Sequence, residues 1–129
     1  MKRKCVLMIL ALVVIFGSVS VASAYAGAGN IHVSRTSNTS ASVSADISYT
    51  KVLTSCTNTI TLQEKYNGSW RTATGVPVKT VTKTKHNTRT LALPYTFTLV
   101  KGKVYRVKAV FTSQDGSTSK VITCHSGTF

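Results

Sequence analysis

Acidic residues are scarce in this sequence: its 129 residues include three Asp and Glu against sixteen Lys and Arg. Glycosidases use paired carboxylates, and other hydrolases use a nucleophile beside a base. The three acids, Asp46, Glu64 and Asp115, are scattered along the chain and cannot be assigned to such a pair. The sequence also has no G-x-S-x-G motif and no glycine-rich phosphate loop. We therefore expect no catalytic residues, no cofactor and no enzyme activity.

Histidine and cysteine are equally rare, with three residues of each. His32, His86 and His125 lack the spacing of metal ligands, and only His125 lies near a cysteine of the main domain. We expect no metal site, and we expect the histidines to be ordinary surface or turn residues.

The longest apolar run lies at the start of the chain. Three cations at residues 2–4 precede the apolar run over residues 5–16, and small residues end at Ala24. These parts in this order are typical of a secretory signal peptide, and the run of about 12 residues is shorter than the roughly 20 that span a bilayer. We expect removal of residues 1–24, with cleavage after Ala26 as the alternative. One domain over 27–129 would remain outside the cell, with no transmembrane segment.

The domain that remains is strongly basic. Removing the leader takes away three of the sixteen Lys and Arg residues, so thirteen cations face three acids and the formal charge is about +10. About 105 residues are enough for one core. Ser and Thr are abundant, helix formers are few and β-branched residues dominate, which favours pleated, half-exposed strands.

Apolar and polar residues alternate with period two along most of the domain. ASVSADISY is the clearest case, and NTITLQEKY, TLALPYTFTL and KVYRVKAVF follow the same pattern, with weaker strands in NIHVSR and SKVITC. NGSW and SQDGST supply turns. About seven short strands at roughly ten-residue spacing predict a single all-β domain, an antiparallel sandwich or barrel. Pro94 predicts that its strand lies at an edge or a bulge.

The stretch LVKGKVYRVKA resembles fibronectin type III domains. It has the spacing L-x-x-G-x-x-Y-x-V-x-A, and the hairpin ITLQEKYNGSWRTA is similar to a hairpin of those domains, so the resemblance covers about residues 57–109. The layout also resembles small exported proteins of Gram-positive bacteria, most of them without an assigned activity. The resemblance implies an immunoglobulin-like β-sandwich and says little about function.

Within that resemblance, Leu99, Gly102 and Tyr105 correspond to the tyrosine corner, in which the tyrosine hydroxyl bonds back to the backbone and the ring packs inside. ASVSADISY lacks the tryptophan that fibronectin domains carry in their second strand. Trp70 is then expected to fill core volume or cap the hairpin, with an exposed binding aromatic as the alternative.

The domain has two cysteines, Cys56 and Cys124. In an exported protein we expect such a pair to form a disulfide. It would close a loop of about 69 residues and stabilise the fold by roughly 4 kcal/mol. Two free thiols and a metal site are the alternatives. The fibronectin strand order would place another strand between the two cysteines, although their Cα atoms must come within about 7 Å.

The segment KTVTKTKHNTRT carries cations at odd positions and threonines at even positions. We predict that the cations of three strands converge on one sheet face and bind a polyanion, since neutralised phosphates release counterions. The predicted residues are Lys65, Lys79, Lys83, Lys85, Arg106 and Lys108.

Outside a Gram-positive cell, the nearest partners are anionic wall polymers such as teichoic acids, or an anionic membrane surface. Nucleic acid is less favoured because stacking aromatics are few. One alternative is that the lysines only block edge-to-edge aggregation and keep the protein soluble. A bacteriocin-like effector would need an amphipathic cationic segment, which the sequence lacks. The oligomeric state is left open.

Overall fold

The computed structural model describes residues 2–7, 13–15, 18–20 and 25–129, with side chains from residue 25 onward. Half of the apolar run of the predicted leader, and Ala24 before the expected cleavage, lie outside these residues, so the leader and its removal stay predictions. The described chain is all-β and contains no α-helix. Within it, no helix is long and apolar enough to cross a membrane.

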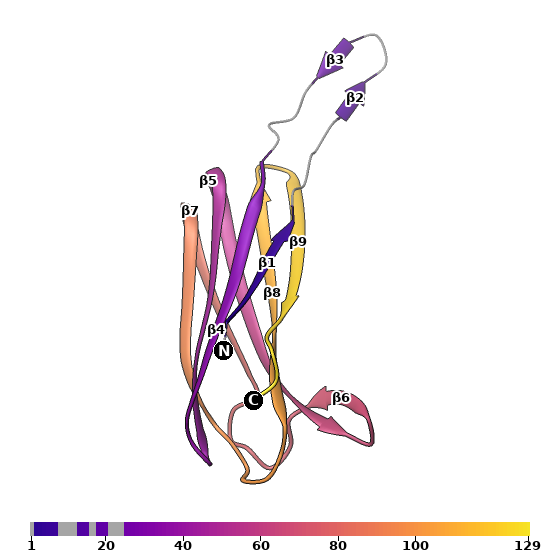
Figure 1. Ribbon diagram of the computed structural model, residues 1–129. Helices are drawn as coiled ribbons and strands as arrows, with labels where there is room; N and C mark the ends of the chain where they lie inside the picture. Colours follow the sequence, from indigo (N-terminus) through magenta and orange to yellow (C-terminus); the bar gives the residue numbers. More distant parts are fainter. Residues whose placement is uncertain (1, 8–12, 16–17, 21–24) are drawn as a thin grey trace.

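The described strands are β1 (Lys2–Leu7), β2 (Val13–Ile15), β3 (Ser18–Ser20), β4 (Gly27–Ser37), β5 (Ser40–Tyr66), β6 (Ser69–Thr72), β7 (Thr80–Thr98), β8 (Tyr105–Asp115) and β9 (Thr118–His125). One antiparallel sheet has the order β1-β4-β5-β8-β9, with β6 and β7 also paired to β5; β2 and β3 form a separate hairpin. Figure 1 shows this sheet as a curled layer of long strands, with the β6 hairpin at its lower end.

The curl comes from two unusually long strands, β5 and β7. Residues 40–48 of β5 pair with residues 90–98 of β7, and the register then shifts between Ser48 and Leu53 before residues 53–61 pair with residues 80–88. The first half of β5 also pairs with β4, whereas the second half pairs with β8. Segments expected to be four separate strands therefore form only two, β5 and β7. Each of these strands continues through the register shift, where a turn was expected to end it.

Asn87 of β7, close to this register shift, has φ of 51°. Asparagine tolerates this left-handed conformation better than most residues with a Cβ. The segment of β5 within the register shift, residues 49–52, has the sequence YTKV, with neither glycine nor proline.

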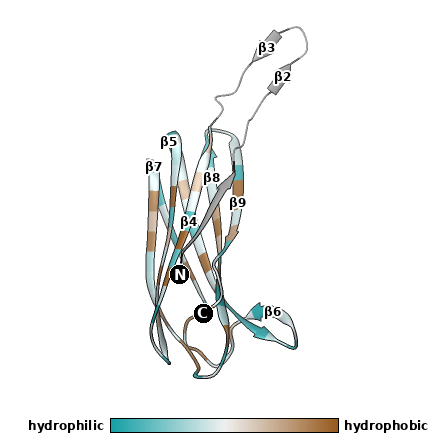
Figure 2. Ribbon diagram, in the orientation of Figure 1, coloured by the Kyte–Doolittle hydropathy of each residue, from teal (hydrophilic) through white to brown (hydrophobic). Residues whose placement is uncertain are grey.

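One hydrophobic core fills the inside of the curled sheet. The largest fully buried aromatic side chains are Tyr105, Phe97 and Phe111, and every strand from β4 to β9 except β6 contributes to the cluster. Figure 2 shows brown apolar segments along these long strands and a hydrophilic β6 hairpin. The alternation predicted for ASVSADISY, NTITLQEKY and KVYRVKAVF is present as alternating buried and half-exposed residues.

The two turns singled out in the sequence also have their expected local structure. Asn67 and Gly68 connect β5 to β6 with φ of 52° and 79°, as a tight hairpin requires. Tyr105 is fully buried; its hydroxyl accepts the Val100 N–H at 2.8 Å and lies 3.4 Å from the Val100 carbonyl oxygen. This is the contact that the fibronectin resemblance implies for the tyrosine.

The predicted Cys56–Cys124 disulfide is wrong, because Cys56 carries a free, buried thiol. Cys56 pairs with Ser113 of β8, and Cys124 pairs with Ala109 of the same strand from the other side. With strands about 4.8 Å apart and a rise of about 3.4 Å per residue, this register separates the two Cα atoms by roughly 16 Å. A disulfide tolerates about 7 Å, so the strand between the cysteines prevents the bridge.

Candidate functional site

The outward face of β5 and β7 carries two parallel columns of threonine. Their hydroxyl groups meet across the two strands at 2.9, 3.1 and 3.3 Å in three successive rows: Thr57–Thr84, Thr59–Thr82 and Thr61–Thr80. Cross-strand hydroxyl pairs of this kind stabilise a sheet modestly. They also establish which side of β7 faces outward.

The lysines of β7 lie on the opposite side from these threonines. Lys83 is in register with the buried Asn58, and the exposed Lys83 ammonium donates to the Ala92 carbonyl oxygen at 3.1 Å, across the bend of β7. Lys85 is in register with Cys56, and the Lys79 carbonyl accepts the N–H of the buried Leu62. The predicted convergence of all six cations is therefore wrong: side chains alternate along β7, and threonine takes the outward positions.

Three of the six predicted cations do share the outward face. Arg106 and Lys108 of β8 are in register with Gln63 and Thr61 of β5, both on the threonine side, and Lys65 lies two residues beyond Gln63 on that same side. We call Lys65, Arg106 and Lys108 the outer patch. Residues two apart on a strand are about 7 Å apart, and neighbouring strands about 4.8 Å. Lys65 and Lys108 therefore each start within about 9 Å of Arg106, and about 14 Å from each other.

Trp70 of β6 borders the outer patch. It is in register with Lys65, its ring is half-buried, and the Arg106 guanidinium carbon lies 4.5 Å above the ring centroid. Arg106 Nε also donates to Gln63 Oε1 at 2.7 Å. Trp70 is absent from the core, so it caps the hairpin on the outer face, and cation–π stacking holds the arginine in place.

The acids of the chain are all engaged away from the outer patch. Glu64 points inward and is fully buried, Asp115 binds Lys51 at 2.8 Å, and Asp46 accepts the Ser44 hydroxyl at 2.7 Å on the other half of the sheet. No carboxylate therefore offsets the positive charge of the outer patch.

Glu64 lies at the centre of a buried ion network beneath the β6 hairpin. Its carboxylate accepts hydrogen bonds from Arg71 at 2.9 Å, from Lys103 at 3.1 Å, and from the backbone and hydroxyl of Thr74. Burial raises the pKa of Glu64, but the Thr74 N–H, Arg71 and Lys103 outweigh it and lower the pKa to about 2. The network ties the hairpin to the loops at Thr74 and Lys103.

The burial of Glu64 and Asn58 was not predicted from the sequence, although the alternation along the strand could have indicated it. Glu64 and Asn58 lie at even-numbered positions of NTITLQEKY, on the same side as the inward-facing Ile60 and Leu62. The Asn58 amide donates to the Ala45 and Leu91 carbonyl oxygens at 3.0 and 3.1 Å, so it joins the two halves of the curled sheet.

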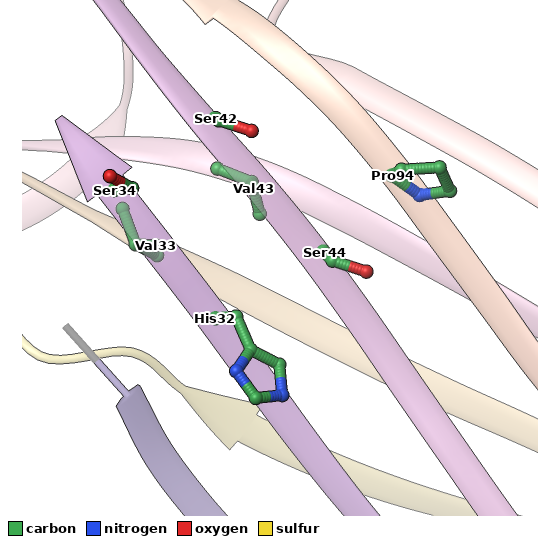
Figure 3. Close-up of a pocket in the computed structure, with 7 residues that line it drawn as sticks. All are labelled: His32, Val33, Ser34, Ser42, Val43, Ser44 and Pro94. Carbon is green, nitrogen blue, oxygen red and sulfur yellow. The ribbon is translucent and has the colours of Figure 1, made fainter. Parts of the chain in front are cut away.

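A shallow pocket of about 390 Å³ lies on the other half of the sheet (Figure 3). Its lining comes from β4, β5 and β7: His32, Val33, Ser34, Ser42, Val43, Ser44 and Pro94. His32 Nε2 lies 3.7 Å from Asp46 Oδ2, and Ser44 donates to Asp46 instead of to His32. A nucleophilic serine needs a base as its hydrogen-bond partner, so these groups are not arranged for acyl transfer.

No cluster of three or more His, Cys, Asp or Glu side chains suited to a metal ion occurs among residues 25–129. Comparison with protein-family models and with curated proteins finds no match to this chain.

Proposed function

We propose that the processed chain is an exported binding protein whose outer patch associates with anionic polymers of the cell envelope. The single observation that carries this proposal is the sorting of charge: Lys65, Arg106 and Lys108 share one face, while each acid is engaged elsewhere. An extended polymer of phosphodiesters can lie across a sheet face and exchange its counterions for these cations.

The neighbours of the outer patch suit a polymer that carries hydroxyl groups as well as charge. The threonine columns and Gln63 offer hydrogen-bond donors and acceptors beside Lys108 and Arg106. Trp70 adds a half-exposed ring at one end. A teichoic-acid type of polymer, with alternating phosphates and polyols or sugars, combines both demands.

The proposed fold is a sandwich of the fibronectin type III kind. The halves of β5 and β7 would each contribute to both layers, one with β4 and the other with β8 and β9; the pairing of the two bent strands and the Tyr105 contact support this arrangement.

Cleavage after Ala24 suits this fold better than cleavage after Ala26. Tyr25 is buried, and its hydroxyl lies 2.9 Å from Ser113 Oγ, so the longer cut would remove a core residue.

A second role is favoured for Lys79, Lys83 and Lys85. Among the described strands β7 pairs with β5 alone, so it is an edge strand, and it also carries Pro94. Exposed lysines and proline on an edge strand are devices that keep the edge from pairing with other chains. We propose that these three lysines protect the β7 edge and do not contact the polymer.

Two variants with equal charge change separate these roles. Replacing Lys65, Arg106 and Lys108 with Glu, or replacing Lys79, Lys83 and Lys85 with Glu, lowers the net charge equally. We expect the outer-patch variant to lose co-sedimentation with Gram-positive cell walls at low salt, and the β7 variant to retain most of it. For wild type, log affinity should fall with log salt, and loss of three phosphate contacts should reduce that slope by about 2.

Equal losses in both variants would mean that only net charge matters and would reject the outer patch. Walls stripped of phosphate polymers, and vesicles of anionic lipid, distinguish the two sources of anionic groups. The β7 variant should also self-associate at high concentration; if it stays monomeric, edge protection is rejected. Circular dichroism checks that each variant is folded.

A further inference from the structure

The β4 strand would form a further sheet edge besides those of β7 and β9, and in the full chain this edge is covered by β1. Six consecutive residues pair antiparallel, from Lys2 opposite His32 to Leu7 opposite Gly27. β1 belongs to the segment that the proposed function requires to be removed on export. The processed chain would therefore lack the strand that covers the β4 edge.

The hydrogen-bonding groups at that edge can be assigned from the β5 side. The Thr50 N–H donates to the Ala26 carbonyl, and the Ala26 N–H donates to Thr50 Oγ1, each at 3.0 Å. Backbone groups alternate sides along a strand, so Gly27, Gly29 and Ile31 direct their N–H and C=O groups toward the β1 side. Loss of β1 removes the backbone partners of these groups.

The β4 strand is also held in the sheet by contacts with strands other than β1. It keeps ten register pairs with β5, and Ile31 and Val33 are buried. A Cβ atom on Gly27 would be 2.7 Å from the ring of Tyr49, its register partner on β5, and a Cβ atom on Gly29 would be 2.7 Å from the ring of Phe111 on β8. The close packing of β4 on the core thus involves β5 and β8 as well as β1.

The β4 and β7 edges of the sheet also differ in charge. The β7 edge carries lysines and Pro94, whereas residues 27–34, GAGNIHVS, contain no lysine, arginine or proline. The covering segment itself contains Lys2, Arg3 and Lys4. Cutting it away thus converts a cationic, paired edge into a neutral, open one, on a chain that is otherwise strongly positive.

We propose that residues 2–7 act as a removable cover and that, after their removal, the β4 strands of two processed chains pair antiparallel across a two-fold axis. A strand is self-complementary about such an axis, so a second copy satisfies the backbone groups of this edge without a new partner. Neutral residues let two positive chains approach here. This inference rests on the export and processing in the proposed function, and the short paired segment predicts a weak dimer in the micromolar range.

The test is sedimentation velocity over a range of concentrations, on the full chain and on a chain of residues 25–129. We expect a concentration-dependent dimer for the shorter chain and a monomer for the full chain. The buried side chains described in the core lie between Tyr25 and Cys124, and circular dichroism checks that the shorter chain folds. A shorter chain that stays monomeric, or that cannot fold without residues 1–24, overturns the proposal.

Asn30 provides the site-specific variant. If the two-fold axis passes at residue 29, 30 or 31, Asn30 lies within one residue of it. Asn30→Lys then places the new lysines of the two copies near each other, and their repulsion should raise the dimer Kd about tenfold. Mixing Asn30→Lys with Asn30→Glu should restore the dimer. The control is Ser42→Lys, an exposed position on β5 in the middle of the same sheet, which should leave the dimer unchanged. An equal effect of Ser42→Lys would reject the β4 edge as the interface.

Wall binding by the same variants is measured in parallel. Loss of wall binding in the outer-patch variant with the dimer intact supports both proposals, whereas failure of wall binding in the wild type alone leaves the dimer inference standing.

Discussion

Replacing Glu64 with glutamine tests whether the buried ion network holds the lower end of the sheet. Glutamine keeps the shape and one carbonyl acceptor for the Thr74 N–H, but it loses the charge and turns an NH₂ group toward Arg71 or Lys103. The Glu64 side chain is 1% exposed, whereas those of Arg71 and Lys103 are 42% and 33% exposed. The two cations can therefore recover part of their hydration, and the penalty should be smaller than for a fully buried pair.

The expected magnitude follows from the pKa of Glu64. A carboxyl group whose pKa falls from 4.5 to about 2 on folding stabilises the folded state by about 3 kcal/mol at neutral pH. Loss of one partner of a buried pair costs about 3–5 kcal/mol. We expect Glu64→Gln to lower the free energy of unfolding by about 3 kcal/mol, measured by urea denaturation at pH 7.

The sign of the pH dependence follows from the direction of the shift. Because the folded pKa is depressed, the stabilisation is fully present above pH 4.5 and is lost as the pH falls toward 2. The wild type should therefore lose stability in this window more steeply than Glu64→Gln.

The matched control is Asp115→Asn, since Asp115 and Lys51 form a partly exposed pair at 2.8 Å. This change should cost about 1 kcal/mol or less. If the two variants lose equal stability, or if their acid unfolding curves are parallel, the Glu64 network does not stabilise the fold as we infer.

Three further changes test the core. Tyr105→Phe removes the hydroxyl that binds Val100 and should cost about 1 kcal/mol in urea denaturation; an unchanged midpoint would show that the hydroxyl contributes nothing. Gly29→Ala places a methyl group 2.7 Å from Phe111 and should cost about 1–3 kcal/mol, so a variant as stable as wild type would contradict the close packing of β4. Burial raises the pKa of the Cys56 thiol, so iodoacetamide should modify it far more slowly in native protein than in denaturant; rapid native labelling would show that the thiol is accessible.

Local patterns in the sequence were sufficient to predict the strands and most of the core. Period-two alternation predicts inward positions such as Val43, Ile60 and Val107, and these are buried. Pro94 predicts an edge strand, and β7 lies at an edge among the described strands. Such predictions succeed because a side chain's direction depends on its own strand alone.

Properties that depend on two strands at once required the tertiary structure. The register shift between Ser48 and Leu53 decides which half of each long strand meets which neighbour. The lysines of β7 face away from Arg106 because the threonines on both strands fall into register on the outer face. The sequence KTVTKTKHNTRT alone does not indicate whether its lysine side or its threonine side lies on the outer face.

The pairing of the cysteines also depends on the arrangement of several strands. Two cysteines in an exported chain indicate a bridge, but the strand between Cys56 and Cys124 keeps their Cα atoms far apart. The sequence by itself thus determined an all-β chain, its inward residues and its excess of positive charge, because these follow from composition and from alternation along each strand. Only the tertiary structure decided which cations share a face and where the few acids are engaged, because register and bending arise from contacts between segments far apart in the chain.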